Sequence, residues 1–366
     1  MISGHATAEG TLKFAQNSDI LQSNFKKMGD LTLSNVGMGT YLGNADDATD
    51  ELVKNSVMQS VLGGINVIDT AINYRSQKAE RSVGRAISEL ISQGKISRDQ
   101  IFISTKNGYV TNDADVKQDF WEYVKNEYAS KGVVNEGDIT SGYHCVTVPY
   151  LDDQLTRSMN NLGLECIDLM YLHNAVEGQI KDISKEKFLE RLQSAFAFYE
   201  QKRAESKIRY YGMATWECFR VMPDNPQYLS LQDAVNMARD VGGEHHGFRF
   251  IQIPYNMYYD QALLAKNQTF DGEQISILES ATRLGIGVFT SVPLMQGRLL
   301  NPGVMPEFGD LKPSHRALQF IRSSPGVLAP LVGQKSSTHV SENLEIMKIP
   351  PLSEAEFVAL VKKLTS

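Results

Sequence analysis

The chain has 366 residues, of which 42% are hydrophobic and 22% are charged, and its formal net charge is −7. This composition is that of a globular protein with ample material for a core, and the negative charge argues against a surface for nucleic acids or anionic membranes. No apolar run reaches the roughly 18 residues of a membrane span, and residues 1–7 lack the pattern of a secretory signal. Three scattered cysteines are too few for a disulfide framework or a zinc site, so we expect a cytoplasmic protein.

Residues 1–24 are polar and irregular, which predicts an extended N-terminal arm before a single domain over residues 25–366. Residues 25–33, with Met28-Gly29-Asp30 as the turn, predict a short hairpin. Strand and helix patterns then alternate, which is typical of βα units around a parallel sheet.

Eight strand patterns follow, the number that closes a (β/α)8 barrel in the α/β class. They cover residues 36–40, 64–69, 101–105, 167–172, 208–212, 248–253, 286–290 and 327–332. Apolar positions at helical spacing predict helices over residues 52–61, 83–91, 151–162, 185–204, 231–241, 277–284 and 354–364.

Reactive side chains stand at the ends of three of these strands. The second strand stops at Asp69, with Tyr74 five residues later, the third stops at Lys106 and the fourth at His173. Because the carboxyl ends of barrel strands share one rim, we expect these four side chains to converge.

Together the four side chains predict a proton-transfer site. A free phenol has a pKa near ~10, which a neighbouring ammonium lowers, and a carboxylate touching the lysine offsets the cost of burying it. A histidine beside the phenol can orient a carbonyl oxygen. None of the four can deliver hydride, so the site needs a cofactor. Taken singly, each has a structural alternative as a cap, packing residue, solvated amine or structural imidazole, and only their joint placement favours catalysis.

Three motifs carry these residues: Gly64-Ile65-Asn66-Val67-Ile68-Asp69-Thr70-Ala71-x-x-Tyr74, then Ser104-Thr105-Lys106, then Ile167-Asp168-Leu169-x-x-x-His173. In order and spacing they resemble the aldo-keto reductases, NAD(P)H-dependent enzymes built on a (β/α)8 barrel. The resemblance covers about residues 25–350. It implies that Tyr74 is the general acid or base, that Lys106 and Asp69 tune it, and that His173 orients the carbonyl. Asp168 lies within its strand, and we expect it to be structural.

A cofactor site is expected beyond the last two strands, because no Gly-x-Gly-x-x-Gly fingerprint opens a Rossmann unit. Residues 333–343 follow the eighth strand, where barrels bind phosphate. They resemble the family's adenosine-binding pattern Gly-x-Arg-x-x-x-Gln-x-x-Glu-Asn, with Lys335 in place of the arginine and His339 in place of the glutamine. Lys335 and Ser336 are expected to hold a 2′-phosphate, which favours NADP(H) and leaves NAD(H) as the alternative. A capped surface helix is the structural alternative.

At the nicotinamide end, Gln252 fits the family's Gln-x-x-Tyr-Asn element and is expected to bind the carboxamide. Ala214-Thr215 replaces the usual Ser-Asn, and Ser291-Val292-Pro293-Leu294 replaces the usual Tyr-Ser-Pro-Leu. The stacking ring is therefore absent, a loss of about 1 kcal/mol, for which a ring from the insertion described below is one substitute. The expected cofactor contacts are Gly39, Thr40, Thr215, Gln252, Ser291, Pro293, Leu294, Gly297, Arg298, Gly333, Lys335, Ser336, His339, Glu342 and Asn343.

Residues 107–150 form an insertion much longer than a usual βα connection. We expect it near the active-site mouth, the alternative being that it packs away from the mouth or at a subunit contact. Tyr41, Trp216 and Met257 are expected to line a partly aromatic substrate pocket.

The predicted function is reduction of an aldehyde, ketone or sugar carbonyl by NAD(P)H. One alternative is an NAD(P)+-dependent aldose or alcohol dehydrogenase that uses the same residues in reverse. Another is a cofactor-binding regulatory subunit with little turnover, as the potassium-channel β subunits of the same superfamily imply. A metal-dependent hydrolase is disfavoured, because no ligand cluster ends a strand and no metal site is expected.

Overall fold

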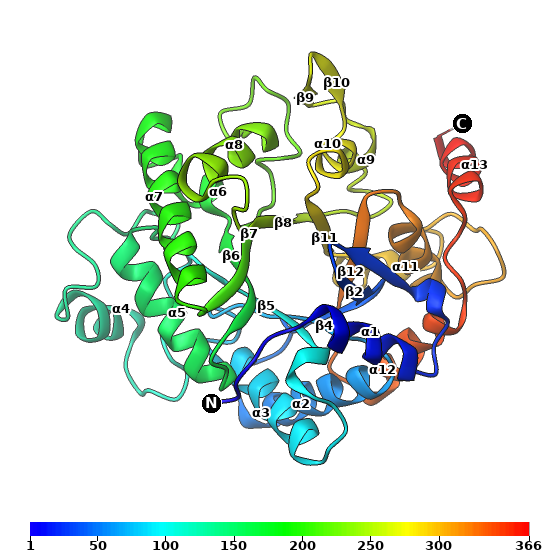
Figure 1. Ribbon diagram of the computed structural model, residues 1–366, viewed down its shortest axis with the longest axis horizontal. Helices are drawn as coiled ribbons and strands as arrows, with labels where there is room; N and C mark the ends of the chain where they lie inside the picture. Colours follow the sequence, from blue (N-terminus) through cyan, green and yellow to red (C-terminus); the bar gives the residue numbers. More distant parts are fainter. Residues whose placement is uncertain (366) are drawn as a thin grey trace.

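The computed structural model describes residues 1–365 and contains a closed eight-stranded parallel barrel ringed by helices (Figure 1). Around the barrel the strands follow the order β11-β12-β3-β4-β5-β6-β7-β8. Their bounds are β3 Gly37–Gly39, β4 Val67–Asp69, β5 Phe102–Asn107, β6 Ile167–His173, β7 Ile208–Ala214, β8 Phe248–Pro254, β11 Gly287–Ser291 and β12 Val327–Gly333. The predicted barrel and its eight strands are confirmed.

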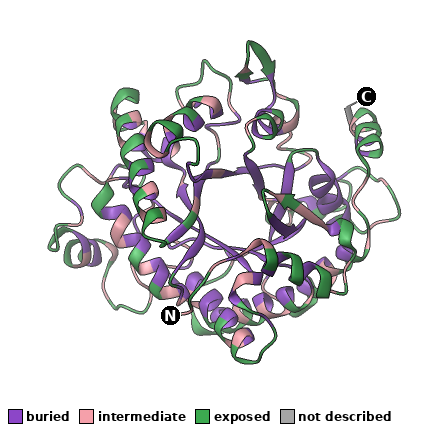
Figure 2. Cartoon of the chain, viewed as in Figure 1, coloured by how far each residue is buried: buried purple, intermediate pink, exposed green. Residues whose placement is uncertain are grey.

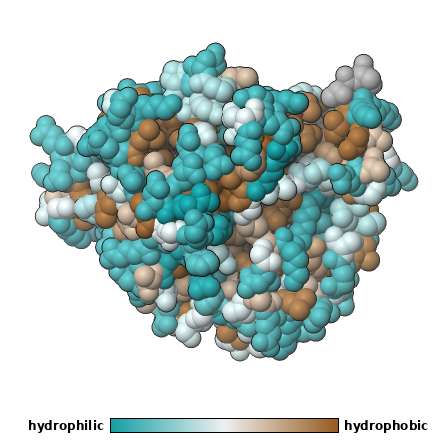
Figure 3. Space-filling model, turned by 45° about the horizontal axis from the view of Figure 1, so that its top comes forward, coloured by the Kyte–Doolittle hydropathy of each residue, from teal (hydrophilic) through white to brown (hydrophobic). Residues whose placement is uncertain are grey.

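The helices pack around this barrel with their inner faces buried (Figure 2). The longer ones are α2 Asp47–Leu62, α3 Lys78–Ser92, α5 Val148–Leu162, α7 Lys185–Ala204, α8 Leu231–Gly242, α10 Ile277–Arg283, α11 Pro313–Ser323, α12 Ser337–Glu345 and α13 Glu354–Thr365. The short elements are α6 Ala175–Gln179, α9 Gln261–Leu264, and the small hairpin of β9 Gln268–Phe270 and β10 Glu273–Ile275. None of the helices in residues 1–365 combines the length and the apolar character that crossing a bilayer requires. The face seen in Figure 3 is mostly hydrophilic, with smaller hydrophobic patches between the polar side chains.

Strand alternation decides which side chains enter the barrel. Phe102, Phe250 and Phe289 pack together in a cluster separate from the helix-facing core, and the rings of Phe250 and Phe289 are stacked with centroids 5.8 Å apart. Successive side chains of a strand point to opposite faces. Residues at even spacing from these interior positions, such as Lys106 four residues after Phe102, therefore also point inward, but at the carboxyl-terminal rim.

The predicted hairpin is also confirmed, as β1 Phe25–Met28 paired antiparallel with β2 Leu31–Ser34. Leu31 and Leu33 are buried in the same cluster as the barrel-interior phenylalanines. The hairpin therefore closes one end of the barrel, which leaves the carboxyl-terminal rim as the open end.

The expectation of an extended arm over residues 1–24 is wrong, because Ala8–Asn17 forms helix α1. Thr7 caps this helix by accepting a hydrogen bond from Gly10 N, and Phe14 is buried on its inner face. The Thr11 hydroxyl accepts a hydrogen bond from Thr32 N of the hairpin at 3.0 Å. With so few apolar residues on its buried face, the helix left no visible periodicity in the sequence.

Residues 107–150 build a small apolar cluster of their own, in which Tyr123, Tyr128 and Tyr150 are buried together. The cluster includes the short helix α4 Phe120–Val124, which lies outside the ring of helices at the left of Figure 1. Only Tyr109 of this segment lines the cavity described below. Most of the insertion thus packs away from the mouth, and its first residues reach it.

Candidate active site

A cavity of about 560 Å³ lies at the carboxyl-terminal rim of the barrel. Its lining includes the last residues of β3, β4, β6, β7, β11 and β12. Asp69, Tyr74 and His173 line it, and Lys106 is fully buried behind them. The volume lies within the range usual for small-molecule and cofactor sites, roughly 300–1,000 Å³. The structure therefore brings the four predicted catalytic residues to one place.

Lys106 and Asp69 form a buried ion pair with a Nζ–Oδ2 distance of 2.5 Å. The ammonium also donates to the Thr70 carbonyl at 2.8 Å. The second oxygen of Asp69 accepts hydrogen bonds from Ser104 Oγ at 2.7 Å and Gln252 Nε2 at 3.0 Å. Burial lowers the pKa of Lys106, but the charges of Asp69 and Tyr74 and the hydrogen bonds to both together outweigh it, and the pKa is raised overall. The lysine is therefore a fixed cation.

The Tyr74 ring lies at the cavity wall between several aromatic and charged groups. Lys106 Nζ is 4.8 Å from its centroid, and the Tyr41 and His173 rings meet it edge-on with centroids 5.0 Å and 6.0 Å away. Burial raises the pKa of the phenol, and the charge and hydrogen bond of Lys106 lower it by less, so the pKa is raised overall. The expectation of a lowered pKa is wrong in sign, because the loss of hydration outweighs the ammonium. The phenol is protonated at neutral pH.

His173 is held neutral beside that phenol. Burial, followed by the charge of Lys106, lowers its pKa well below the ordinary value. Its Nδ1 is buried without a hydrogen-bond partner, and the Tyr109 ring meets it edge-on at 5.0 Å. Its backbone carbonyl lies 2.6 Å from Nε2 of His144, a buried residue of the insertion. His173, the last residue of β6, is therefore in contact with the insertion both through its ring and through its backbone carbonyl.

Most of the predicted cofactor residues line this same cavity. They are Gly39, Thr40, Thr215, Gln252, Ser291, Pro293, Leu294, Gly297, Gly333, His339, Glu342 and Asn343. Arg298, Lys335 and Ser336 do not line it. Ser336 caps α12 by accepting from His339 N at 3.3 Å, and a Cβ placed on Gly43 would lie 3.4 Å from Lys335 Nζ. Lys335 thus extends beside the loop that follows β3.

Several polar side chains of the lining already donate within the protein: the Thr40 hydroxyl to the Asp69 carbonyl, Gln252 Nε2 to Asp69 Oδ1 and Asn343 Nδ2 to Gln334 Oε1. The amides of Gln252 and Asn343 each have a second N–H for a nicotinamide dinucleotide.

The Thr215 hydroxyl donates to Glu177 Oε1 of α6, which also accepts from the backbone N–H groups of Trp216 and Glu217. This hydroxyl is therefore used within the protein. The lining extends from α12 to Tyr74. A Cβ atom placed on Gly297 would meet no heavy atom within 4 Å, so there is open space beside this lining residue. Within residues 1–365, no group of three or more His, Cys, Asp or Glu side chains is arranged to hold a metal ion.

Two of the three predicted substrate residues line the cavity. Tyr41 and Trp216 do so with exposed fractions of 56% and 41%. Met257 does not, and instead packs against the cluster that contains Leu299 and Met305. The Asn256 side chain accepts from the backbone of Tyr258 and Tyr259 in the turn that contains Met257. The expectation for Met257 is therefore wrong.

Sequence reasoning missed several lining residues, of which Tyr109 and Asn174 matter most. Asn174 Nδ2 donates to the Tyr109 hydroxyl at 3.0 Å, and both residues line the cavity beside His173. The available signal was position, because Tyr109 comes three residues after Lys106 and Asn174 directly follows His173. The missed lining residues are Leu42, Asn73, Tyr109, Asn174, Ala214, Val292, Gln296, Leu300, Ser314 and Leu331.

Comparison with known proteins places this site in a family. A model of the Aldo/keto reductase family matches residues 35–307. The NADH-specific methylglyoxal reductase of Escherichia coli is 26% identical over 191 residues, which are 50% of this chain and 49% of that protein. An aldo-keto reductase of Bombyx mori is 36% identical over 77 residues, 20% of this chain and 24% of that protein. The chain thus spans about half the length of the first relative and about a quarter of the second.

Solved structures of similar fold cover nearly the whole chain. An aldo/keto reductase of Klebsiella pneumoniae in complex with NADP and acetate has a TM-score of 0.59 and 20% identity, with 95% of each chain covered. The holo form of an aldo-keto reductase of Bacillus halodurans has a TM-score of 0.60 and 18% identity, covering 93% of this chain and 96% of that one. At such identities these structures support the fold alone. The family model, however, matches well over half of the chain, and the chain therefore belongs to the aldo/keto reductase family.

Proposed function

We propose that the protein reduces an aldehyde, ketone or sugar carbonyl to the alcohol, with NADPH as hydride donor and Tyr74 as proton donor. The observation that carries this proposal is the convergence of Asp69, Tyr74 and His173 on one cavity, with Lys106 buried 2.5 Å from Asp69. Belonging to the aldo/keto reductase family supports the same reaction class.

A nicotinamide cofactor, when bound in this cavity, would supply the hydride that reduces the carbonyl carbon. His173, as a neutral imidazole, orients the carbonyl oxygen by a hydrogen bond. Tyr74 donates its proton to that oxygen as negative charge develops, and Lys106 stabilises the resulting phenolate. Asp69 holds Lys106 in place through their ion pair. The raised pKa of Tyr74 keeps the proton on the phenol before the reaction.

For the cofactor we propose that Gln252 binds the carboxamide and that Lys335 and Ser336 bind a 2′-phosphate. The residues of α12 that line the cavity support the adenosine end, since a helix N-terminus favours phosphate. The Klebsiella pneumoniae structure contains NADP, whereas the Escherichia coli relative is NADH-specific.

The test is a turnover assay with NADPH and a panel of aldehydes, ketones and aldoses, run in both directions. We expect Tyr74→Phe to abolish reduction while the dissociation constant for NADPH changes less than about threefold, because the phenol hydroxyl acts on the carbonyl oxygen. Unchanged turnover in Tyr74→Phe would remove the tyrosine from the acid role. Tight cofactor binding with no turnover on any carbonyl would favour a regulatory subunit, and faster alcohol oxidation would favour a dehydrogenase.

A further inference from the structure

The turn that follows Tyr74 has an unusual backbone. Arg75, Ser76 and Gln77 have φ values of 52°, 50° and 76°. This left-handed region favours glycine, because a Cβ there crowds the backbone. Three successive residues with side chains persist in it only where surrounding contacts hold them.

The side chain of Arg75 supplies contacts of this kind. It is 1% exposed, and its Nη1 lies 2.6 Å from Asp50 Oδ1 of α2. Its Nη2 donates to Ser82 Oγ of α3 at 3.0 Å. A guanidinium buried against a carboxylate has few alternative positions, because leaving either charge unpaired in the interior is costly.

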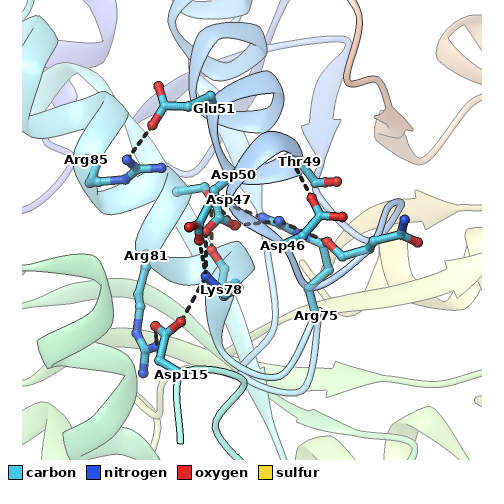
Figure 4. Close-up of polar contacts among 12 residues, drawn as sticks. Asp46, Asp47, Thr49, Asp50, Glu51, Arg75, Lys78, Arg81, Arg85 and Asp115 are labelled. Atoms are coloured by element: carbon cyan, nitrogen blue, oxygen red, sulfur yellow. Dashed lines mark hydrogen bonds and ion pairs between the residues drawn. The ribbon is translucent and has the colours of Figure 1, made fainter.

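Lys78 connects the same carboxylate to the insertion. Its ammonium lies 2.9 Å from Asp50 Oδ2, 3.0 Å from Asp47 and 2.9 Å from Asp115. Figure 4 shows Lys78 between the two aspartates of α2 and Asp115 of the insertion. The turn is therefore fastened to α2 and to residues 107–150 at once.

We infer that Arg75 and Asp50 form a positioning pair that holds Tyr74 in register with Lys106 and the cavity. The inference rests on the proposed role of Tyr74 as proton donor. Asp50, Arg75 and Lys78 are absent from the cavity lining. Loss of the pair therefore acts on proton transfer through the placement of the phenol, and leaves the cofactor contacts in place.

The decisive comparison is Arg75→Ala against Arg75→Gly. Both remove the ion pair, but alanine retains the backbone strain of the left-handed turn, whereas glycine adopts that conformation freely. We expect Arg75→Ala to lower kcat roughly tenfold or more at saturating NADPH. Arg75→Gly is the rescue variant and should recover most of that turnover, while both leave the dissociation constant for NADPH within about twofold.

Asp50→Asn removes the charge that pairs with Arg75, and it tests the inference even if Arg75→Ala does not fold. It should lower kcat roughly tenfold in the wild-type background and less than about twofold in the Arg75→Gly background. With glycine at position 75, the turn no longer needs the ion pair to hold its conformation. Glu51→Gln is the matched control, since Glu51 and Arg85 form an exposed ion pair between the same two helices (Figure 4). Its kcat should equal that of the wild type.

A kcat of Arg75→Ala within about twofold of the wild-type value overturns the inference, because the turn would then hold Tyr74 in place without the ion pair. An Asp50→Asn effect no larger than that of Glu51→Gln overturns it as well. Failure of the proposed function is a separate result, since it appears as turnover retained in Tyr74→Phe.

Discussion

Tyr74 and Lys106 show how burial and charge compete at a single site. Desolvation raises the pKa of the phenol by more than the ammonium lowers it. The same ammonium remains charged because Asp69 lies 2.5 Å away. The phenol therefore keeps its proton in the resting site despite Lys106. In the proposed reaction the ammonium of Lys106 acts when that proton leaves.

Removing that ammonium should slow chemistry without weakening cofactor binding. We expect Lys106→Met to lower kcat by about 10²–10³-fold, the usual cost of losing one group that stabilises developing charge. Lys106 is absent from the cavity lining, so the dissociation constant for NADPH should change little. Single-turnover rates and a fluorescence titration measure the two quantities. A kcat within threefold of the wild type would contradict the proposed stabilisation of the phenolate.

A substitution of Lys335 tests the proposed contact with the adenosine end of the cofactor. Its Nζ lies beside Gly43, outside the lining of the cavity itself. If it contacts a 2′-phosphate, Lys335→Ala should raise the dissociation constant for NADPH about tenfold, or about 1.4 kcal/mol, and that for NADH less than twofold. Lys348→Ala, which removes an exposed lysine just beyond α12, is the control. Equal effects on the two cofactors would exclude the phosphate contact.

The places of the proposed catalytic residues could be predicted because Asp69, Lys106 and His173 lie at or next to strand ends and Tyr74 lies in the turn just after β4, so that chain position brings all four to the rim. The place of Met257 could not, since it depends on packing against Leu299 and Met305, which are distant in the sequence. Tyr109 was missed for a related reason. Its position depends on the fold of the insertion, which the sequence pattern does not specify.

At the scale of elements, strong periodicity decided what could be predicted. The pattern over residues 185–204 gave the bounds of α7 without error, whereas α1 was missed because its stability depends on contacts with the hairpin. The insertion has no regular period, and its cluster forms between residues distant in sequence, such as Val110 and Tyr150. The contact of the insertion with the site, from His144 to the His173 carbonyl, could not be predicted from the sequence either.

His144 should make stability depend on pH. Burial lowers its pKa to about 4, although its bond to the His173 carbonyl opposes this. An unfolded histidine has a pKa near ~6.5, so below that pH the unfolded chain binds a proton that the folded protein excludes. The residue therefore stabilises the fold fully above pH ~6.5 and loses that contribution, about 3 kcal/mol at most, as pH falls toward 4.

His144→Gln should flatten this dependence, because glutamine does not titrate. Urea unfolding at several pH values between 4.5 and 7 measures the slope of the unfolding free energy against pH. The exposed His245→Gln variant gives the background change. A slope in His144→Gln as steep as in the wild type would assign the acid sensitivity to other groups.

At the scale of the whole molecule, the two ends of the barrel have separate tasks. The hairpin and α1 close one end, and the cavity occupies the other. Asp168 anchors the closed end, since its carboxylate pairs with Arg98 at 2.6 Å and accepts from Ala6 N and Ile103 N. Its predicted structural role is confirmed by these contacts. That the hairpin closes this end of the barrel could not be predicted from the sequence. It depends on Leu31 and Leu33 packing against residues of strands that are distant in the chain.

This division predicts that stability and activity can be altered separately. Asp168→Asn leaves the Arg98 guanidinium buried without its counter-charge, which should lower the unfolding free energy by about 3–5 kcal/mol. Asp168 precedes His173 by five residues of β6, about 16 Å along the strand. At a temperature where the variant is fully folded, kcat and KM should therefore equal the wild-type values. Lys187→Ala breaks an exposed ion pair with Glu190 and should change the unfolding free energy by less than about 0.5 kcal/mol. A fall in kcat comparable to that of Lys106→Met would show instead that the closed end of the barrel controls the geometry of the catalytic rim.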